Sequence, residues 1–328
     1  MMFIKIKIYW IVLYLLSFLM SGCTYPVNAN YETRVPRLSF KPSATIPQST
    51  SPIPVMVNTI TVSLPTSTFT PSFIPSATDT PIPTATPIPT DTPLPSETPT
   101  LEWNPPGYIT APILLYHHVS NDGPGIRYIV TMDDFREQME TLRDLNYLSI
   151  TASDLANVII YGGERPNRSV VITFDDGFMD VYQNAFPIMQ ELGFVGVVYI
   201  YVDHVGSNGY VNAEQIRVLA DNGWEIGNHS MSHADLTKNH TSVYYEVQQS
   251  RLTLEELTGE KADTFAYPYG VTNDYVIGVV RDSGYLAGMG LGLSCDHTLD
   301  TLYNLSRIEV QADYSISTFR GLLPWSGN

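Results

Sequence analysis

The segment VVITFDDGFMD, residues 170–180, ends an apolar run with two adjacent carboxylates. The run has the composition of a buried strand, and Asp175 and Asp176 follow it directly, before Gly177. Two neighbouring carboxylates can divide the work of hydrolysis, because one can bind a cation while the other accepts a proton from water. An Asp-Gly turn on the surface would explain the same residues without chemistry. The doublet alone does not decide between the two.

A histidine pair gives the second candidate group. In GWEIGNHSMSH, residues 223–233, His229 and His233 follow another strand-like run, and one helical turn would place both imidazoles on the same side. Two histidines and one carboxylate are a common ligand set for a catalytic divalent cation, with positions left open for water and substrate. Such a cation would also let both aspartates ionise, whereas without it one of two adjacent acids is pushed towards protonation. Histidines at this spacing are often structural, so their place at a strand end adds weight.

Short apolar runs alternate with amphipathic stretches throughout the region that would have to position these groups. Strands are expected at 112–119, 169–174, 195–201, 224–229, 264–268, 285–290 and 305–310. Helices are expected at 131–146, 184–193, 212–223, 242–259 and 274–284. This alternation predicts an α/β fold with a parallel sheet covered by helices, and about seven strands indicate an incomplete (β/α) barrel. Active residues of such folds gather at the carboxyl ends of the strands.

Three motifs in chain order resemble those of the NodB-homology polysaccharide deacetylases, carbohydrate esterase family 4. They are TFDDG (173–177), HSMSH (229–233) and FAYPYG (265–270). The resemblance covers most of 110–328. It implies a distorted (β/α) barrel and a metal-dependent hydrolase that removes acetyl groups from an N-acetylhexosamine polysaccharide.

The resemblance also implies a role for each matching residue. Asp175 would be the catalytic base. Asp176, His229 and His233 would hold a divalent metal, with zinc as the first expectation. The backbone N–H of Tyr269 would stabilise the oxyanion that forms during hydrolysis.

The sequence departs from the usual family pattern in two places. Ala266 stands where an arginine usually orients the base, and no histidine near the C-terminus can act as the general acid. PILLYHHVS, residues 112–120, resembles the segment of surface poly-N-acetylglucosamine deacetylases in which the acid histidine comes first. His117 is therefore the expected acid, and His118 is expected to face the opposite side of the strand. Arg307, in LSRIEV, is expected to replace the missing arginine.

Other interpretations remain open from the residues alone. Asp203 and His204 are rival candidates for the acid. The same metal site could remove O-acetyl groups from xylan, and Ala266 leaves open a glycan-binding module without activity. An exposed trough for the polymer would need aromatic side chains, for which the candidates are Tyr128, Trp224 and Tyr267.

The net negative charge of the chain comes entirely from the region with the motifs. Residues 108–328 contain 12 Lys and Arg against 28 Asp and Glu, whereas the first 107 residues contain five of each sign. An acidic domain of this kind is a poor partner for nucleic acid. The partner that the resemblance implies is an acetylated glycan such as poly-N-acetylglucosamine, peptidoglycan or a chitin-like polymer, and we expect the protein to be a monomer.

The N-terminal third is predicted to serve as leader and tether. Residues 1–22 have two lysines near the start and then an apolar run, as in a signal peptide, and the LMSGC around Cys23 resembles a lipoprotein lipobox. An uncleaved membrane anchor is the alternative. Residues 23–107 are rich in Thr, Ser and Pro and are expected to be a disordered linker. The domain at 108–328 would then be held by lipid on the outer face of the membrane, or secreted if the lipobox is not used.

Overall fold

The structure is a computed structural model, and it describes residues 100–123 and 125–326. The expected leader, Cys23 and the linker up to residue 99 lie outside the described residues. Within the described ranges, none of the helices is both long enough and apolar enough to cross a bilayer.

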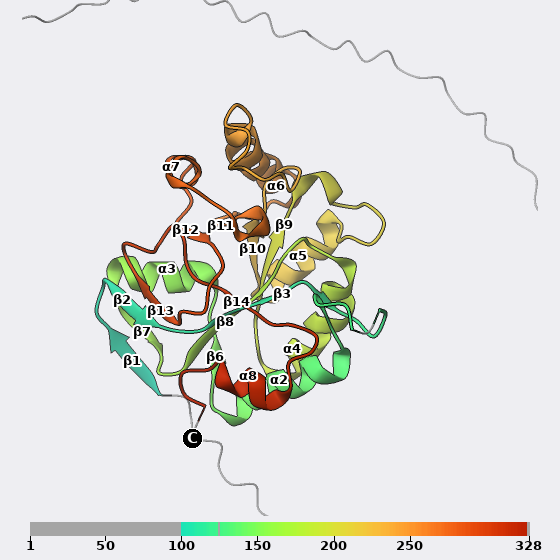
Figure 1. The fold of residues 1–328 in the computed structure, drawn as a ribbon, viewed down its shortest axis with the longest axis vertical. Helices are drawn as coiled ribbons and strands as arrows, with labels where there is room; N and C mark the ends of the chain where they lie inside the picture. The colour runs from blue at the N-terminus through green and yellow to red at the C-terminus, as the bar shows by residue number, and fades with distance from the viewer. Residues whose placement is uncertain (1–99, 124, 327–328) are drawn as a thin grey trace, which may run out of the picture. The chain divides into compact units, whose positions relative to one another are not determined.

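A curled parallel sheet forms the centre of the domain (Figure 1). Its strand order is β12-β11-β10-β9-β8-β3-β14, every pairing along it is parallel, and β6 adds to β8. The strands are β3 (Ile113–Tyr116), β6 (Leu148–Ser149), β8 (Ser169–Phe174), β9 (Val197–Ile200), β10 (Glu225–Asn228), β11 (Thr264–Ala266), β12 (Ala287–Met289) and β14 (Ile308–Glu309). All seven expected strands are present, and the predicted incomplete α/β barrel is confirmed.

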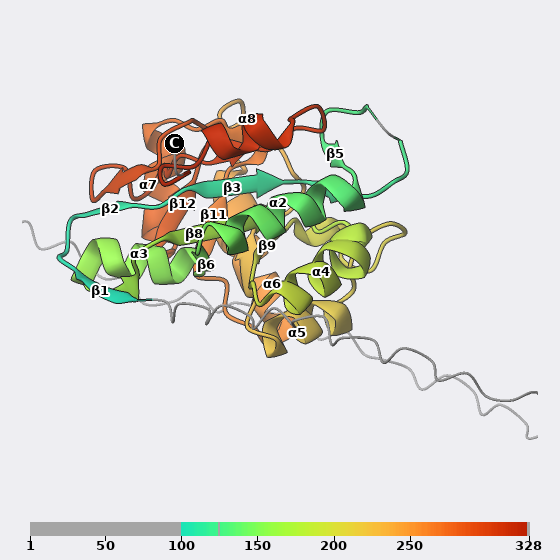
Figure 2. The ribbon, with the colours of Figure 1, turned by 90° about the horizontal axis from the view of Figure 1, so that it is seen from below.

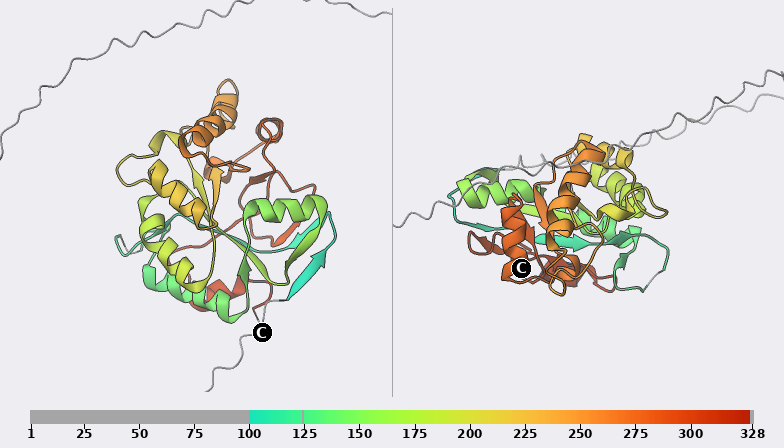
Figure 3. Two further views of the ribbon diagram at one scale, coloured as in Figure 1. Left: turned by 180° about the vertical axis from the view of Figure 1, so that it is seen from behind. Right: turned by 90° about the horizontal axis from the view of Figure 1, so that it is seen from above.

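Helices cover the outside of the sheet, as the views in Figures 1 and 3 show. They are α2 (Met132–Asp144), α3 (Ala152–Tyr161), α4 (Phe186–Leu192), α5 (Ala213–Asp221), α6 (Ser250–Thr258), α7 (Asp274–Asp282) and α8 (Ile316–Gly321). Single turns precede or join them: η1 (Val181–Ala185), η2 (Val202–His204), η3 (Tyr245–Gln249) and η4 (Pro268–Gly270). The five expected helices are confirmed; α5, for example, starts at Asn212, whose side chain caps the N–H of Gln215.

Several short elements were not predicted. Three are two-stranded pairs: β1 (Leu101–Asn104) with β7 (Gly163–Pro166), β2 (Tyr108–Thr110) with β13 (Asp296–Thr298), and β4 (His118–Val119) with β5 (Ile129–Val130). The helices α3 and α8 were also missed. The helix α8 packs against α2, and in the view of Figure 2 the two helices lie on opposite sides of β3. Because β1 pairs with β7, the folded region begins before the expected boundary at residue 108.

Candidate active site

One cavity of about 550 Å³ opens at the carboxyl ends of the central strands. The seven residues of the mechanism expected from the sequence all line this cavity: His117, Asp175, Asp176, His229, His233, Tyr269 and Arg307. The carboxyl ends of neighbouring parallel strands meet at one edge of a sheet, so β3, β8 and β10 deliver the histidines and aspartates to the same place.

Three side chains in the cavity converge as a metal-binding triad would. Asp176 Oδ1 lies 3.6 Å from His229 Nε2 and 3.3 Å from His233 Nε2, and the three ligand atoms lie within 4.8 Å of one another. Asp176 Oδ1 is buried and has no hydrogen-bond partner among the described residues. A buried carboxylate oxygen that faces two imidazole nitrogens is the donor set that a divalent cation requires, so these residues fit one.

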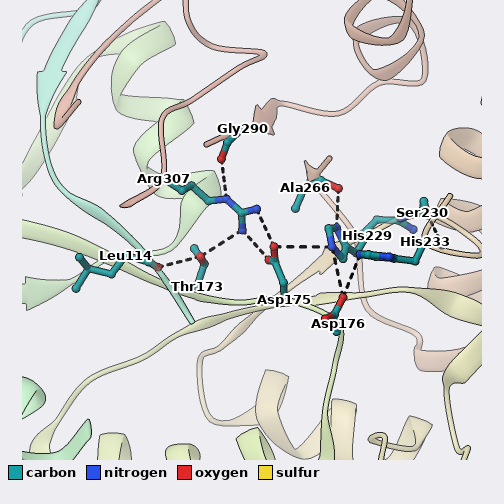
Figure 4. A network of polar contacts seen from close by, with 11 residues as sticks. Leu114, Thr173, Asp175, Asp176, His229, Ser230, His233, Ala266, Gly290 and Arg307 are labelled. Atoms are coloured by element: carbon teal, nitrogen blue, oxygen red, sulfur yellow. Dashed lines mark hydrogen bonds and ion pairs between the residues drawn. The ribbon is translucent and has the colours of Figure 1, made fainter. Parts of the chain in front are cut away.

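The imidazole of His229 is fixed in the orientation that metal binding needs (Figure 4). Its Nδ1 lies 2.8 Å from the carbonyl oxygen of Ala266. Because a carbonyl oxygen can only accept, Nδ1 carries the proton and Nε2 keeps its lone pair for a cation. The burial of His229 lowers its pKa to about 4, although the charge of Asp175 acts in the opposite direction. The ring is therefore neutral at pH 7, as a ligand must be.

The two histidines do not share a helical turn, and that expectation was wrong. Residues 229–233 form an irregular loop after β10, in which Ser230 has φ 73° and His233 has φ 60°. The loop bonds to side chains instead of closing a helix: Asn228 Oδ1 accepts from the N–H of Ser230 at 2.7 Å, and Ser230 Oγ accepts from the N–H of His233 at 2.9 Å. These local bonds compete with helical ones, and they bring the two rings to a centre-to-centre distance of 4.9 Å.

Asp175 is held by a buried arginine from the far end of the chain. Arg307 precedes β14 and makes a bidentate pair with the carboxylate, Nη1 to Oδ1 at 2.6 Å and Nη2 to Oδ2 at 2.8 Å (Figure 4). Its Nε donates to the carbonyl oxygen of Gly290 at 3.1 Å, so the guanidinium cannot turn away. Arg307 thus supplies beside Asp175 the guanidinium that Ala266, at the usual position of the orienting arginine, does not have.

The pKa values of the two aspartates are shifted in opposite directions. Burial alone would raise the pKa of Asp175, but the charge and hydrogen bonds of Arg307 outweigh it and lower the pKa to about 2. Burial, and then the charge of Asp175, raise the pKa of Asp176 to about 7. Asp175 is therefore ionised at neutral pH, whereas Asp176 needs a further positive charge to be fully ionised.

The adjacent histidines both face the cavity. His117 is half-buried, and its ring centre lies 4.8 Å from that of Tyr128. Burial lowers the pKa of His117, while the charge of Asp175 acts against this shift. His118 was expected on the opposite side of the strand, but it lines the same cavity. The alternation is broken because β3 ends at Tyr116 and a separate strand begins at His118.

His118 is nevertheless fixed by neighbours that His117 lacks. Its Nδ1 donates to Asp180 Oδ2 at 2.6 Å, and its ring stacks on that of Phe178 with 3.7 Å between the centres. Tyr269, which also lines the cavity, lies in η4 with φ 60°, and its ring centre is 4.6 Å from that of His233.

Some candidates lie away from the cavity. Asp203 is exposed, and the ring of His204 packs between Tyr201 and Tyr210, with ring centres 4.4 and 4.6 Å away. Of the aromatic candidates, Tyr128 lines the cavity and is 42% exposed. The prediction that Trp224 and Tyr267 line an exposed trough was wrong, because both side chains are buried. The strands predicted around them are present as β10 and β11, and the two side chains pack in the interior.

Glu309 is a cavity residue that the sequence reasoning missed. It lines the cavity, and Arg127 and Gln311 both donate to its Oε2. It stands two residues after Arg307, and residues two apart in a strand face the same side, so its position could have been predicted from that of Arg307.

Comparisons with known proteins agree with this geometry. Residues 162–288 match the family model described as polysaccharide deacetylase. A Bacillus subtilis protein, named only provisionally as a polysaccharide deacetylase, is 25% identical over 209 residues, which are 63% of this chain and 74% of that protein. The poly-beta-1,6-N-acetyl-D-glucosamine N-deacetylase of Staphylococcus aureus is 27% identical over 203 residues, 57% of this chain and 69% of the relative. The crystal structure of a Bacillus cereus polysaccharide deacetylase superposes with a TM-score of 0.59 at 25% identity, covering 66% of this chain and 69% of that one.

Proposed function

Since this chain is a member of the polysaccharide deacetylase family, hydrolases that cleave carbon–nitrogen bonds, we propose that it removes N-acetyl groups from an N-acetylhexosamine polysaccharide. A polymer of β-1,6-linked N-acetylglucosamine is the first substrate to test, because the Staphylococcus aureus relative is named for it. The observation that carries the proposal is the bidentate pair of Asp175 and Arg307 beside the triad of Asp176, His229 and His233.

The roles of the residues follow from their geometry. Asp176, His229 and His233 would hold a divalent metal, with zinc as the first choice for their oxygen and nitrogen donors. When bound, such an ion acidifies water and polarises the acetyl carbonyl. Asp175 is ionised and oriented by Arg307, so it can accept the proton of the attacking water. Its low pKa makes it a weak base, and the role therefore requires acidified water.

The remaining steps concern the oxyanion and the leaving amine. The backbone N–H of Tyr269, a cavity residue whose ring lies next to that of His233, is the proposed donor to the oxyanion. His117 is the proposed donor of a proton to the nitrogen that leaves, because it lines the same cavity from β3. The proposal of an inactive glycan-binding module rested on Ala266, and Arg307 removes that reason by binding Asp175.

Acetate release from a panel of polymers tests the function. The full chain is incubated with poly-β-1,6-N-acetylglucosamine, peptidoglycan, chitin oligomers and acetylated xylan, and free acetate is measured. We expect release from at least one polymer of N-acetylhexosamine. Release from acetylated xylan alone would instead identify an O-deacetylase.

Replacing His117 with Ala should lower kcat for an N-acetylated glycan by ~10²–10⁴, the usual contribution of a positioned acid. The loss should be much smaller for an aryl acetate ester, whose leaving group needs no protonation. His118→Ala is the matched control: we expect a milder effect on kcat and a loss of thermal stability, because His118 is tied to Asp180 and Phe178. Equal losses of the His117 variant on amide and ester would indicate substrate positioning, and normal amide turnover would exclude the acid role.

We also propose that the protein is anchored by lipid at the outer face of the bacterial membrane. The support is the leader-like segment at 1–22 and the lipobox-like LMSGC before a long Thr- and Pro-rich segment. Mass spectrometry of the mature N-terminus should find a diacylated Cys23 as the first residue. A cleaved, unmodified N-terminus elsewhere would make this a secreted protein.

A further inference from the structure

The loop at 229–233 has to be held in a conformation that it would not adopt alone. Ser230 and His233 both have positive φ, a region in which residues other than glycine are strained. Both proposed metal-binding histidines are at the ends of this loop, so the relative position of their Nε2 atoms depends on the backbone between them. Something outside the loop must therefore fix its middle, which is formed by Met231 and Ser232.

The carboxylate of Glu246 makes these contacts. Its Oε2 accepts from the backbone N–H of Ser232 at 2.9 Å, and its Oε1 accepts from Ser232 Oγ at 2.7 Å. The N–H of Met231 is shared between Oε2 and the backbone carbonyl oxygen of Glu246, each at 3.1 Å. Glu246 is only 5% exposed. Two backbone donors and one hydroxyl, all from the same loop, satisfy both oxygens of the carboxylate.

No basic side chain pairs with Glu246 within the part of the chain that the structure describes. A buried carboxylate is costly unless hydrogen bonds compensate its charge, and here the side-chain oxygens receive that compensation from the loop alone. The residue therefore serves the loop and not an ion pair that would hold the helix.

The same helical segment holds the start of the loop through a second contact. Ser250 Oγ, at the beginning of α6, lies 3.1 Å from Asn228 Oδ1, the oxygen that accepts from the N–H of Ser230. The same hydroxyl lies 2.5 Å from the carbonyl oxygen of Glu246, so its single proton is shared between these acceptors. Glu246 lies in η3, a π-helical turn that runs directly into α6. Turns of this kind are frequent at functional sites, where they re-aim a side chain.

We propose that Glu246 is a positioning residue that sets the geometry of the metal-binding loop. By fixing the backbone of Met231 and Ser232, it makes the imidazoles of His229 and His233 converge on Asp176. This inference rests on the proposed role of the triad in binding a divalent cation, but not on the identity of the polymer.

Zinc binding by the full chain, freed of metal, tests the proposal independently of turnover. Glu246→Gln keeps the shape of the side chain but puts an amide where the loop needs a second acceptor oxygen. We expect the dissociation constant for zinc, measured by competition with a chromophoric chelator, to rise about 10–100-fold. Acetate release by the variant should return towards the wild-type rate at saturating zinc. Glu256→Gln, at an exposed position of α6, is the matched control and should bind zinc as the wild type does.

Ser232→Ala removes only the hydroxyl donor to Glu246 and should raise the dissociation constant by a smaller factor. It decides the matter if Glu246→Gln does not fold. Unchanged zinc affinity in the folded variants, with or without a lower melting temperature, would overturn the proposal, as would a wild type that binds no zinc. A wild type that binds zinc tightly but releases no acetate would contradict the proposed function and leave the role of Glu246 standing.

Discussion

Replacing Asp175 with Asn should reduce acetate release by at least ~10²–10⁴ while one zinc ion per chain is still bound. The bidentate partner of this carboxylate is Arg307, and its approach to the triad is longer, 3.8 Å from Oδ2 to His229 Nε2. Its loss therefore removes the proposed proton acceptor but none of the three converging ligand atoms. Zinc content by elemental analysis and acetate release are measured on the same preparation.

Asp176→Asn is the matched control for this prediction. Its Oδ1 is the buried oxygen that faces both imidazoles, so this variant should lose stoichiometric zinc together with activity. If Asp175→Asn loses zinc as completely as Asp176→Asn does, the proposed division of the doublet is wrong.

Replacing Arg307 with Met should lower the free energy of unfolding by about 3–5 kcal/mol, because it leaves the carboxylate of Asp175 buried without its partner. Urea denaturation of the metal-free protein at pH 7 measures the loss. Acetate release should also collapse, since the base loses the bidentate contact that orients it.

Measuring the same substitution in an Asp175→Asn variant separates the contribution of the ion pair to stability from that of packing. The substitution Arg307→Met should cost much less when Asp175 is already Asn, because no buried charge is then left unpaired. Equal costs in both backgrounds would show that Arg307 stabilises the domain by packing alone.

The parts of the fold that could be predicted are those with a strong local pattern. The strand β8 is a continuous apolar run buried along its whole length, and its bounds agree with the expectation. The helix α5 was marked by its Asn212 cap and by Gly223 beyond its end. The short pairs β1–β7 and β2–β13 could not be predicted, because strands of three or four residues, most of them partly exposed, leave no clear alternation in the sequence.

For the site, residue types at strand ends indicated the two aspartates and the histidine pair, and the resemblance to the deacetylases added His117, Tyr269 and Arg307. His117 and Arg307 were proposed from opposite ends of the domain, and both line the cavity with Asp175. The conformation of the loop at 229–233 could not be predicted, because it depends on side-chain bonds to Asn228 and Glu246 and not on propensity. The side of the strand on which His118 lies was predicted wrongly for a different reason. The chain is interrupted between β3 and β4, so the regular alternation of sides along one strand does not extend to His118.

The most direct test of a metal-dependent de-N-acetylase is acetate release from poly-β-1,6-N-acetylglucosamine by the full chain before and after chelation. Release should stop when a chelator removes the ion and return when one equivalent of zinc is added back, whereas Asp176→Asn should respond to neither step. If the metal-free wild-type protein released acetate at the same rate, the proposed dependence on a metal would be contradicted.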